Sequence, residues 1–572
     1  MKHYCTGLLF GLMIAVGSTS AFAQGGVTSS IAGVVEDISG GTIPGATVVA
    51  RNNATGFEYT AVTSQNGTFT FGAVPPGTYT VTITLSGFKT VVQTGVVVRA
   101  GVPGDVRATL EVGGIEEVVE VQGRSEIVQT QTSAVSTTFD VNQISNLPLI
   151  SRSALDFVVN LPGVNTPSGN RQSTVNGLPR SAINITIDGM SVQDNHLKTG
   201  DGFFARVTPR LDAVEEVTVS SAAQGADAAG QGAVQIRFVT RSGGNAFSGS
   251  VYHYFRSDAL NTNTWFNERD GLDKPELLQN QPGFRAGGPI NIPGVYDGTG
   301  RMFYFVNYEE FRQPQTIRRN RTILTPAAQA GVFSYNSAAG VRSVDLLALA
   351  AANGHIPTMD PAVAQLLADI RSSTSGAGSI TDLEDPVLQR FSWNVNQRSL
   401  NKYPTGKIDF NVSENHRFTV SGNWHHINSN PDTLNGRDPQ FPGMAVQGTQ
   451  DSYRYTIYGS LRSTLRGSIV NEFKVGGTGG PTYFANEIGS SMWSSPFGNE
   501  AGYKLGISAA DISNPSSGSS TSSREASTKI LENTVNWVRG AHSFNFGGAF
   551  TQADVWLYNQ THVPTITFDV AT

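Results

Sequence analysis

The sequence has few residues that could cross-link the chain or hold a metal ion. Its 572 residues include a single cysteine, Cys5, and nine histidines. One thiol cannot form an internal disulfide, so disulfide-stapled folds and cysteine-ligated zinc sites are excluded. His425 and His426 are adjacent, and on a strand their rings would point to opposite faces, where they cannot chelate one ion. We therefore expect no cofactor and no metal.

Charged residues and catalytic motifs are also scarce. Only 15% of the residues are charged, the formal net charge is −6, and no run of Lys or Arg occurs, so nothing favours a nucleic-acid partner. The motifs H-E-x-x-H, G-x-S-x-G and G-x-x-x-x-G-K-[ST] are missing. The glycine-rich segment Gly476 to Gly480 is predicted as a loop, because no strand-to-helix unit surrounds it. These absences argue against an enzyme.

The third absence is a long hydrophobic run. The apolar residues from Leu8 to Val16 are too few for a membrane helix, which needs about 18, and they are followed by Ala21-Phe22-Ala23. This pattern predicts a Sec-type signal peptide over residues 1–23, so that the mature chain begins at Gln24. An exported chain without apolar helices is either soluble or crosses a membrane as a closed β-barrel.

What the sequence does contain favours β-structure in several domains. Its length exceeds the usual 100 to 200 residues of one domain, and it has 63 glycines among many Thr, Ser, Val and Asn residues. Between about Ser30 and Gly113, short Val/Thr/Ile/Phe runs alternate with turn signals, and Asn66-Gly67 is a strong hairpin signal. We predict a β-sandwich over residues 24–113, which we expect to fold on its own.

This sandwich resembles the carboxypeptidase-regulatory-like domain, which has a transthyretin-like fold. The matching motifs occur in order: Gly33, Pro44-Gly45-Ala46, Asn66-Gly67, Pro76-Gly77-Thr78-Tyr79 and Gly87-Phe88. The resemblance implies no catalytic residues, since glycine and proline here serve turns. Phe69, Phe71 and Tyr79 could form a carbohydrate-binding face, but alternating aromatic residues are more often core.

Residues 124–245 have the pattern of an α+β domain. Ser151 or Ser153 can cap a short helix that Pro162-Gly163 ends. The segment "INITIDGMSV" predicts a strand and a turn, and "VEEVTVSS" predicts a second strand.

These segments resemble the plug domain of TonB-dependent outer-membrane receptors, particularly the large Oar-like members that carry an N-terminal regulatory-like sandwich. The resemblance rests on "NLPLISR", "LPGV", "STVNGLP", "ITIDGMSV", "VEEVTV" and "VTRSGGNAFSGSVYHYFR". The resemblance implies that the protein lies in the outer membrane of a Gram-negative bacterium. It also implies that a ligand binds outside, that TonB pulls on a peptide ahead of the plug, and that the plug then rearranges to admit the ligand. One departure is Arg237, where the receptors are usually rich in glycine, and a changed plug-to-barrel contact is expected there.

The resemblance also gives a role to the segment ahead of the plug. Residues 114–123 are predicted as a linker carrying a candidate TonB box, with the residues Glu116, Glu117, Val118, Val119, Glu120 and Val121. Such a short β-prone peptide can add a strand to the periplasmic domain of TonB. The alternative is that it forms the last strand of the sandwich or a plain linker.

Residues 246–572 are predicted as the N-terminal part of an outer-membrane barrel. In "HRFTVSGNWH", for example, Phe418 and Trp424 face one way while Arg417 and His425 face the other. Strands of about ten residues with one apolar and one polar face fit a wall between lipid and a wet lumen. Residues 312–400 are predicted as mostly loop, with a helix that begins at Asp360. Trp265, Phe266 and Trp493 could contact a ligand, although packing within loops is favoured.

The fold class is therefore mainly β: a sandwich, an α+β plug and a partial antiparallel transmembrane barrel. Barrels of this family have 22 strands, and about nine or ten fit between Phe247 and Thr572, so we expect the chain to be truncated. The expected partners are TonB, outer-membrane lipid and an unidentified extracellular ligand: a siderophore, oligosaccharide or peptide. The alternative function is that of a cell-surface adhesion or structural protein that does not transport.

Overall fold

The computed structural model describes residues 28–114, 117–122, 135–140, 143–144, 149, 151–222, 233–376, 378–444, 446, 448–466, 468–485, 504–507, 512–513, 520–539, 542–561 and 565–568. The predicted signal peptide and Gln24 lie outside these residues. Among the helices in these ranges, none combines the length and the apolar character that a membrane span requires.

The first unit is a β-sandwich of two sheets. The smaller sheet has the order β4 (Thr68–Val74), β1 (Ser29–Asp37) and β7 (Gly104–Leu110). The larger sheet has the order β3 (Glu58–Val62), β2 (Thr47–Asn52), β5 (Gly77–Thr84), β6 (Thr90–Val98) and β8 (Val118–Gln122). Inward residues of both sheets alternate with exposed ones and form one core, as the turn-and-strand pattern predicts.

The aromatic residues that could have formed a carbohydrate-binding face lie inside this core. Phe69 and Phe71 are 3% and 5% exposed, and Tyr79 is fully buried. The Tyr79 hydroxyl donates to the Pro75 carbonyl at 2.8 Å, which satisfies its polar end. The carbohydrate-binding alternative is wrong, because stacking on a sugar needs exposed rings.

The second unit comprises the described residues between 135 and 240 and is called the plug after the domain predicted for this part of the sequence. It is built on a five-stranded mixed sheet. Its order is β13 (Met190–Ser191), β12 (Ile183–Ile187), β15 (Val234–Thr240), β14 (Val214–Ala222) and β9 (Val135–Asp140). Helix α3 (Ala154–Val158) starts after Ser153, whose side chain makes no capping hydrogen bond. The short elements around it are β10 (Val164–Asn165), η1 (Asn170–Gln172), β11 (Thr174–Val175), η2 (Arg180–Ala182) and η3 (Leu211–Ala213). Ile183, Ile185 and Ile187 are all buried, so this sheet has a true core of its own.

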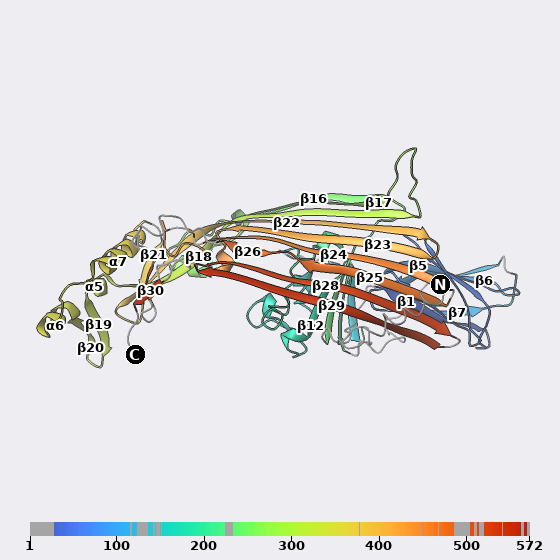
Figure 1. Ribbon diagram of the computed structural model, residues 1–572, viewed down its shortest axis with the longest axis horizontal. Helices are drawn as coiled ribbons and strands as arrows, with labels where there is room; N and C mark the ends of the chain where they lie inside the picture. Colours follow the sequence, from blue (N-terminus) through green and yellow to red (C-terminus); the bar gives the residue numbers. More distant parts are fainter. Residues whose placement is uncertain are drawn as a thin grey trace, which may run out of the picture.

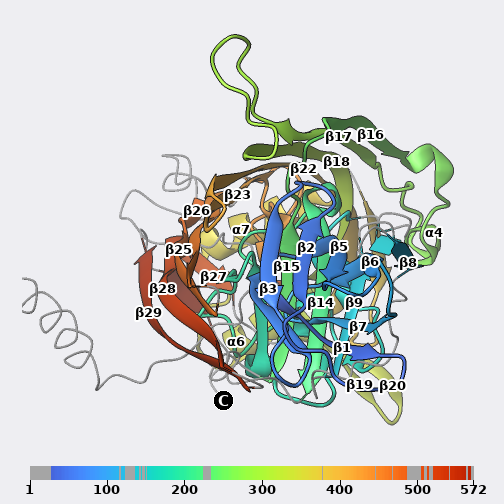
Figure 2. The ribbon, with the colours of Figure 1, turned by 90° about the vertical axis from the view of Figure 1, so that its right-hand side faces the viewer.

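The third unit is a long curved antiparallel sheet. Its neighbouring strands are β16 (Ser248–Ser257), β17 (Leu278–Pro289), β18 (Met302–Leu324), β22 (Leu388–Ser413), β23 (His416–Asn430), β24 (Thr449–Arg466), β25 (Ile469–Gly479), β28 (Ser520–Arg539) and β26 (Thr482–Ala485), while β29 (His542–Thr561) pairs with β28 and β21 (Ser379–Asp382) with β22. The strands run along the molecule, with the sandwich at one end (Figure 1). Seen along the strands, the sheet forms an arc around the plug (Figure 2).

The two faces of this sheet meet different surroundings. On β23, Arg417, Asn423 and His425 are at most 7% exposed because they lie on the inner face, where the sandwich and the plug are packed, whereas Phe418 and Trp424 are about two-fifths exposed. Phe544, Phe546 and Phe550 of β29 are similarly exposed. The alternation therefore places apolar side chains outward and polar ones inward, as a lipid-facing wall requires.

Several strands are longer than the ten residues that we predicted. β18 has 23 residues and β22 has 26, and at about 3.3 Å per residue each extends roughly three times the ~25 Å apolar band of such barrels. Much of the predicted loop 312–400 is consequently strand. The alternation of apolar and polar residues cannot reveal the full length of such a strand. A strand that continues beyond the membrane into water keeps its hydrogen bonds to the neighbouring strands but no longer has an apolar face.

The remaining connection between β18 and β22 is a small subdomain beyond the wall. It contains α5 (Pro326–Gln329), the hairpin of β19 (Val332–Ser337) and β20 (Gly340–Asp345), α6 (Leu346–Ala352) and α7 (Pro361–Ser373). The predicted helix start is confirmed: the Asp360 carboxylate accepts from Ala362 N at 2.8 Å and from Val363 N at 3.2 Å. Other connections hold α4 (Trp265–Arg269), η5 (Asp258–Leu260) and η6 (Thr433–Asn435), and β27 (Lys504–Ile507) pairs with β30 (Thr565–Phe568).

The glycine-rich segment from Gly476 to Gly480 is not the loop that we predicted, since Gly476 to Gly479 form the end of β25. A Cβ at Gly476 would lie 2.4 Å from the Ile457 carbonyl oxygen and 2.9 Å from the Met190 sulfur. Glycine is needed there because the plug approaches the wall closely, which the local sequence does not reveal.

Candidate ligand cavity

The plug is attached to the wall through a buried carboxylate, Glu309 on β18. Glu309 is fully buried. Its Oε1 accepts from Arg210 Nε at 2.9 Å and its Oε2 accepts from the Tyr252 hydroxyl at 3.0 Å, while Arg152 Nε lies 3.7 Å from Oε2. Arg152 also pairs with Asp212 of the plug. Glu309 of the wall thus neutralises Arg210 directly and shares Arg152 with Asp212, an arrangement that is costly to break.

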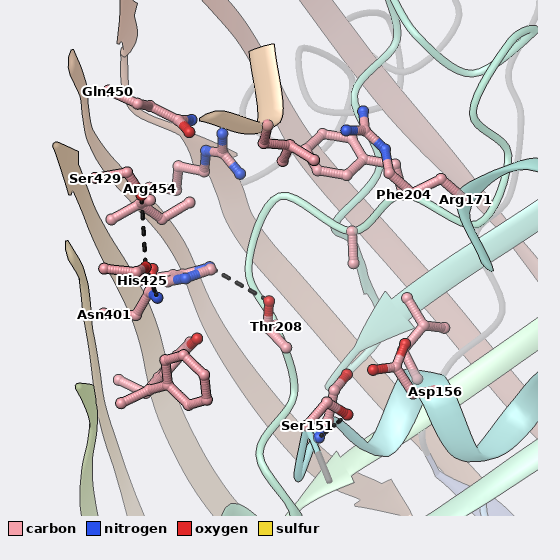
Figure 3. A pocket seen from close by; sticks show the side chains of 18 of the residues that line it. Ser151, Asp156, Arg171, Phe204, Thr208, Asn401, His425, Ser429, Gln450 and Arg454 are labelled. Atoms are coloured by element: carbon pink, nitrogen blue, oxygen red, sulfur yellow. Dashed lines mark hydrogen bonds between the residues drawn. The ribbon is translucent and has the colours of Figure 1, made fainter. Parts of the chain in front are cut away.

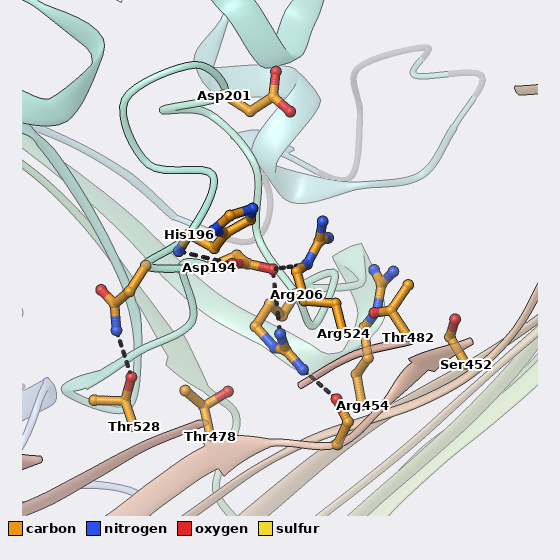
Figure 4. A network of polar contacts seen from close by, with 12 residues as sticks. Asp194, His196, Asp201, Arg206, Ser452, Arg454, Thr478, Thr482, Arg524 and Thr528 are labelled. Carbon is orange, nitrogen blue, oxygen red and sulfur yellow. Dashed lines mark hydrogen bonds and ion pairs between the residues drawn. The ribbon is translucent and has the colours of Figure 1, made fainter. Parts of the chain in front are cut away.

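A second attachment surrounds Asp194 of the plug (Figure 4). One of its oxygens lies 3.2 Å from Arg206 Nη1 and 3.1 Å from Arg524 Nε of β28. Arg206 is fully buried and also donates to the Gly480 carbonyl of the wall. Burial lowers the pKa of the Arg206 guanidinium, and Asp194 opposes that shift.

Three further contacts, each a single hydrogen bond, also attach the plug to the wall. Ser421 of β23 donates to Asp188 at 2.6 Å, Asn195 donates to Thr528 of β28 at 2.8 Å, and Lys407 of β22 donates to the Thr240 carbonyl at 2.9 Å. These contacts involve three different strands, so the plug is held across the arc and not at one edge.

Between the plug and the wall lies a cavity of about 670 Å³ (Figure 3). This volume is in the range of small-molecule sites, roughly 300 to 1,000 Å³. The wall contributes mainly amide and hydroxyl groups, from Gln313, Gln315, Gln397, Ser399, Asn401, Ser429 and Gln450. Aromatic rings come from Phe203, Phe204, Phe311, Tyr403 and Phe484, and charged groups from Asp156, Arg171, Asp201, Arg210, Arg454 and Arg524. Such a lining suits a polar ligand that can both hydrogen-bond and stack.

The two adjacent histidines point to opposite faces, as we predicted. His425 is buried at the cavity, 3.3 Å from the Thr208 hydroxyl, and packs against Tyr403. His426 hydrogen-bonds Asp451 at 2.8 Å on the other face.

Trp265 and Phe266, two of the aromatic residues that we considered as ligand contacts, do not line this cavity. Trp265 and Phe266 belong to α4, contact each other, and lie near the guanidinium of Arg269. Trp493 lies outside the described residues.

The candidate TonB box lies partly in the sandwich. Glu116 is outside the described residues, whereas Val118, Val119, Glu120 and Val121 belong to β8, which pairs in parallel with β6. Val119 packs against the sandwich core while its neighbours are exposed. The Glu117 carboxylate lies 3.2 Å from Lys89 Nζ, and the hydrogen bonds that the Lys89 ammonium donates to Glu117 and Glu111 raise its pKa. The segment therefore has the β-propensity that we inferred from the sequence, and its role as a box stays a prediction.

Arg237, the departure from the family pattern, faces the sandwich. A Cβ added to Gly101 would come within 2.9 Å of Arg237 Nη1, and this guanidinium also donates to Ser220 at 3.3 Å. We expected a changed plug-to-barrel contact, but the contact observed at Arg237 is between plug and sandwich.

The sandwich is also bound to the inner wall, mainly through Arg462 of β24. Arg462 Nε donates to the Ala73 carbonyl at 2.7 Å and Nη2 to the Gly72 carbonyl at 3.1 Å, and its guanidinium carbon lies 4.7 Å from the centre of the Tyr59 ring. The sandwich consequently lies at the mouth of the arc, beside the plug.

We predict that Arg462→Ala weakens this attachment by about 1.5–3 kcal/mol, the usual loss for hydrogen bonds to a charged group. The measurement is the trypsin cleavage rate of the sandwich in membrane-embedded protein. Arg466→Ala is the control, since Arg466 is exposed on the same strand. Equal cleavage rates in the two variants would contradict the prediction.

Sequence reasoning found the inward face that carries Arg454 and His425, but it missed the residues that matter most. Glu309, Asp194 and Arg206 had no local signal, because each is recognisable only through partners far away in the chain: Arg210 is 99 residues from Glu309, and Gly480 is 274 residues from Arg206. The pairing of two buried charged side chains can be inferred only once the register of the strands that carry them is known.

Comparison with known proteins places these units in families. Residues 239–572 match the outer membrane beta barrel domain, and residues 30–111 match the carboxypeptidase regulatory-like domain. The TonB-dependent transporter Oar of Myxococcus xanthus is 24% identical over 326 residues, which cover 54% of this chain and 30% of that protein.

Solved structures that are similar include the outer membrane transporter YddB of Escherichia coli, with 11% identity and a TM-score of 0.46, covering 76% of this chain and 50% of that one. A mutant ferric enterobactin receptor of Pseudomonas aeruginosa in complex with enterobactin is 12% identical, with a TM-score of 0.39, covering 74% and 50%. The chain thus spans half or less of the length of these relatives. With a matching barrel model over more than half of its residues, the chain belongs to the outer membrane beta barrel domain family of the Gram-negative outer membrane, and it is similar to the TonB-dependent transporter Oar.

Proposed function

We propose that the protein takes up a polar ligand across the outer membrane with energy transmitted by TonB. The observation that carries this proposal is the cavity of about 670 Å³ between plug and wall, with its amide, hydroxyl and aromatic lining. A ligand bound there contacts both units, so any movement of the plug changes its site. The relatives named above are transporters and receptors, and we assign no catalytic step to the cavity.

We further propose that TonB engages the segment from Glu116 to Val121. In the described part of the chain, β8 is the last strand of its sheet, so one of its backbone edges can accept another strand. Val118 and Val121 are 62% and 43% exposed, which leaves their side chains accessible to a partner. Among the residues that the structure describes, five pairs join β8 to β6, so the strand is weakly held.

The same segment is well placed to transmit force. The chain continues from β8 to β9, which is the edge strand of the plug sheet and pairs only with β14 in the described residues. A pull on β8 would therefore act first on an edge strand, whose hydrogen bonds can separate one after another. The ordered removal of β9 would loosen the plug beside the cavity.

Proline substitutions test this proposal. The N–H groups of neighbouring residues on a strand point to opposite edges. One of the two variants Val119→Pro and Glu120→Pro therefore removes a hydrogen-bond donor from the outer edge of β8. We expect at least one of them to reduce capture by the purified periplasmic domain of TonB by about tenfold or more, since each lost backbone hydrogen bond and the fixed φ weaken strand addition. Capture is measured with full-length protein in detergent.

Val119→Ala is the matched control, because it removes the side chain but keeps the N–H, and we expect nearly normal capture. Normal capture by both proline variants would contradict the assignment of the box. The alternative of an adhesion protein predicts that surface binding of a partner is unaffected by either proline.

A further inference from the structure

Arginine side chains from distant parts of the chain gather at one corner of the cavity. Arg171 and Arg206 come from the plug, Arg454 from β24 and Arg524 from β28 (Figures 3 and 4). The carboxylates among them are Asp194, shared by Arg206 and Arg524, and Asp201, which lies 2.6 Å from Arg171. Four guanidinium groups face these two carboxylates, and the more distant carboxylate of Glu525 also acts on Arg206, so the corner keeps a formal excess of at least one positive charge among the described residues.

Arg454 accounts for much of that excess. It is 5% exposed and lines the cavity. Its Nε donates to the Thr482 hydroxyl at 3.2 Å, and its guanidinium carbon lies 5.3 Å from the centre of the Phe204 ring. Within the described residues, no carboxylate lies within ion-pair distance of Arg454. A buried guanidinium carries five donors and is costly to desolvate without a counter-ion, so the site favours an anion.

Phe204 brings a second arginine to the same place. The Arg171 guanidinium carbon lies 4.3 Å from the centre of the Phe204 ring, so Arg171 and Arg454 both pack against this ring. The face of an aromatic ring attracts cations, and this attraction offsets the repulsion between the two guanidinium groups. The other acid that lines the cavity, Asp156, accepts from Asn170 Nδ2 at 3.1 Å and lies away from Arg454 in Figure 3.

We propose that Arg171, Arg454 and Arg524 form an oxyanion subsite, so that the transported ligand is a hydroxyl-rich molecule bearing a carboxylate or phosphate. This inference rests on the proposed function of the cavity as the ligand site. The forked guanidinium groups match the geometry of carboxylate and phosphate oxygens. The amides of Gln313, Gln397 and Asn401 on the wall serve the hydroxyl groups of the same molecule.

The test uses the full chain purified in detergent and three probes: inorganic phosphate, trigalacturonate and the neutral sugar maltotriose, each measured by isothermal titration. We expect phosphate and trigalacturonate to compete for one site and trigalacturonate to bind more tightly than maltotriose. Arg454→Gln should weaken trigalacturonate by about tenfold or more, the size of a lost charge-assisted contact. Arg312→Gln is the control, because it removes the same charge from a side chain that is 59% exposed and does not line the cavity.

Arg171→Gln provides a second variant that should fold, since its side chain is 44% exposed, and it should weaken trigalacturonate as well. Unchanged binding of trigalacturonate in both cavity variants would overturn the subsite, as would failure of both anionic probes to bind the unmodified chain. Binding of maltotriose alone would overturn the acidic class while leaving the cavity as a ligand site. Neither result depends on TonB, so the proposed energy coupling is tested separately by the proline variants.

Discussion

Glu309→Ala is expected to loosen the plug from the wall by about 3–5 kcal/mol, the usual cost of removing one partner from a buried ion pair. The substitution leaves the guanidinium groups of Arg210 and Arg152 buried, and it removes the acceptor of the Tyr252 hydroxyl. Glu309→Gln should cost less, because an amide oxygen still accepts a hydrogen bond. The measurement is the rate at which protease cleaves between residues 151 and 222 in membrane-embedded protein.

The neighbouring residue supplies the control. Glu310 is also a largely buried carboxylate, but its partners Tyr308 and Arg312 belong to the same strand, β18. Glu310→Ala should therefore leave the plug as resistant as in the unmodified protein. If Glu309→Ala and Glu310→Ala were cleaved at the same slow rate, Glu309 would not be an attachment point of the plug.

Raising the pH from 5 to 8 is expected to weaken the contact between sandwich and plug by roughly 3 kcal/mol. Glu216 of the plug is buried, and burial raises the pKa of its carboxyl to about 7. A hydrogen bond from Ala100 N at 2.5 Å and the charge of Arg99 oppose this rise, whereas the charges of Glu215 and Asp140 add to it. When the sandwich separates, the carboxyl returns to water and to its ordinary pKa near 4.5.

The sign follows from proton binding. Between pH 4.5 and 7 the bound state holds a proton on Glu216 that the separated state has lost, so a rise in pH disfavours the bound state. Below pH 4.5 both states are protonated and the contact is at full strength. Above pH 7 the bound state must carry a buried charge, and the loss is complete.

Distances between two spin labels, measured by electron paramagnetic resonance, can follow this separation. The labels can be attached to introduced cysteines because the sequence has no cysteine after Cys5. Spin labels on cysteines at Ile38 of the sandwich and Val295 of the β17–β18 turn, which are 76% and 80% exposed, should show a distance distribution that broadens with rising pH. Glu216→Gln should make the distribution independent of pH. A pH-dependent distribution in Glu216→Gln would assign the effect to another group.

Much of the architecture followed from local patterns. The turn residues between short Val/Thr runs determined the sandwich, and the alternation around Phe418 and Trp424 determined which face of the wall meets lipid. Asp360 determined the start of a helix, since its carboxylate and the N–H groups that it caps lie within three residues of each other. These features depend on neighbours a few residues apart, so the sequence alone contains them.

Other features were decided only by the tertiary structure. The sequence could not distinguish whether Val118 to Val121 continue the sandwich, because a parallel pairing with β6 depends on the return of the chain to that edge. It could not show that β18 and β22 continue far beyond the membrane, or that Gly476 lies where the plug meets the wall. Above all, the partners of Glu309, Asp194 and Arg454 come from segments that the curvature of the sheet brings together. Local alternation determines which side chains point inward, but strand register and curvature decide which of them meet, and those depend on hydrogen bonds between strands that are distant in the sequence.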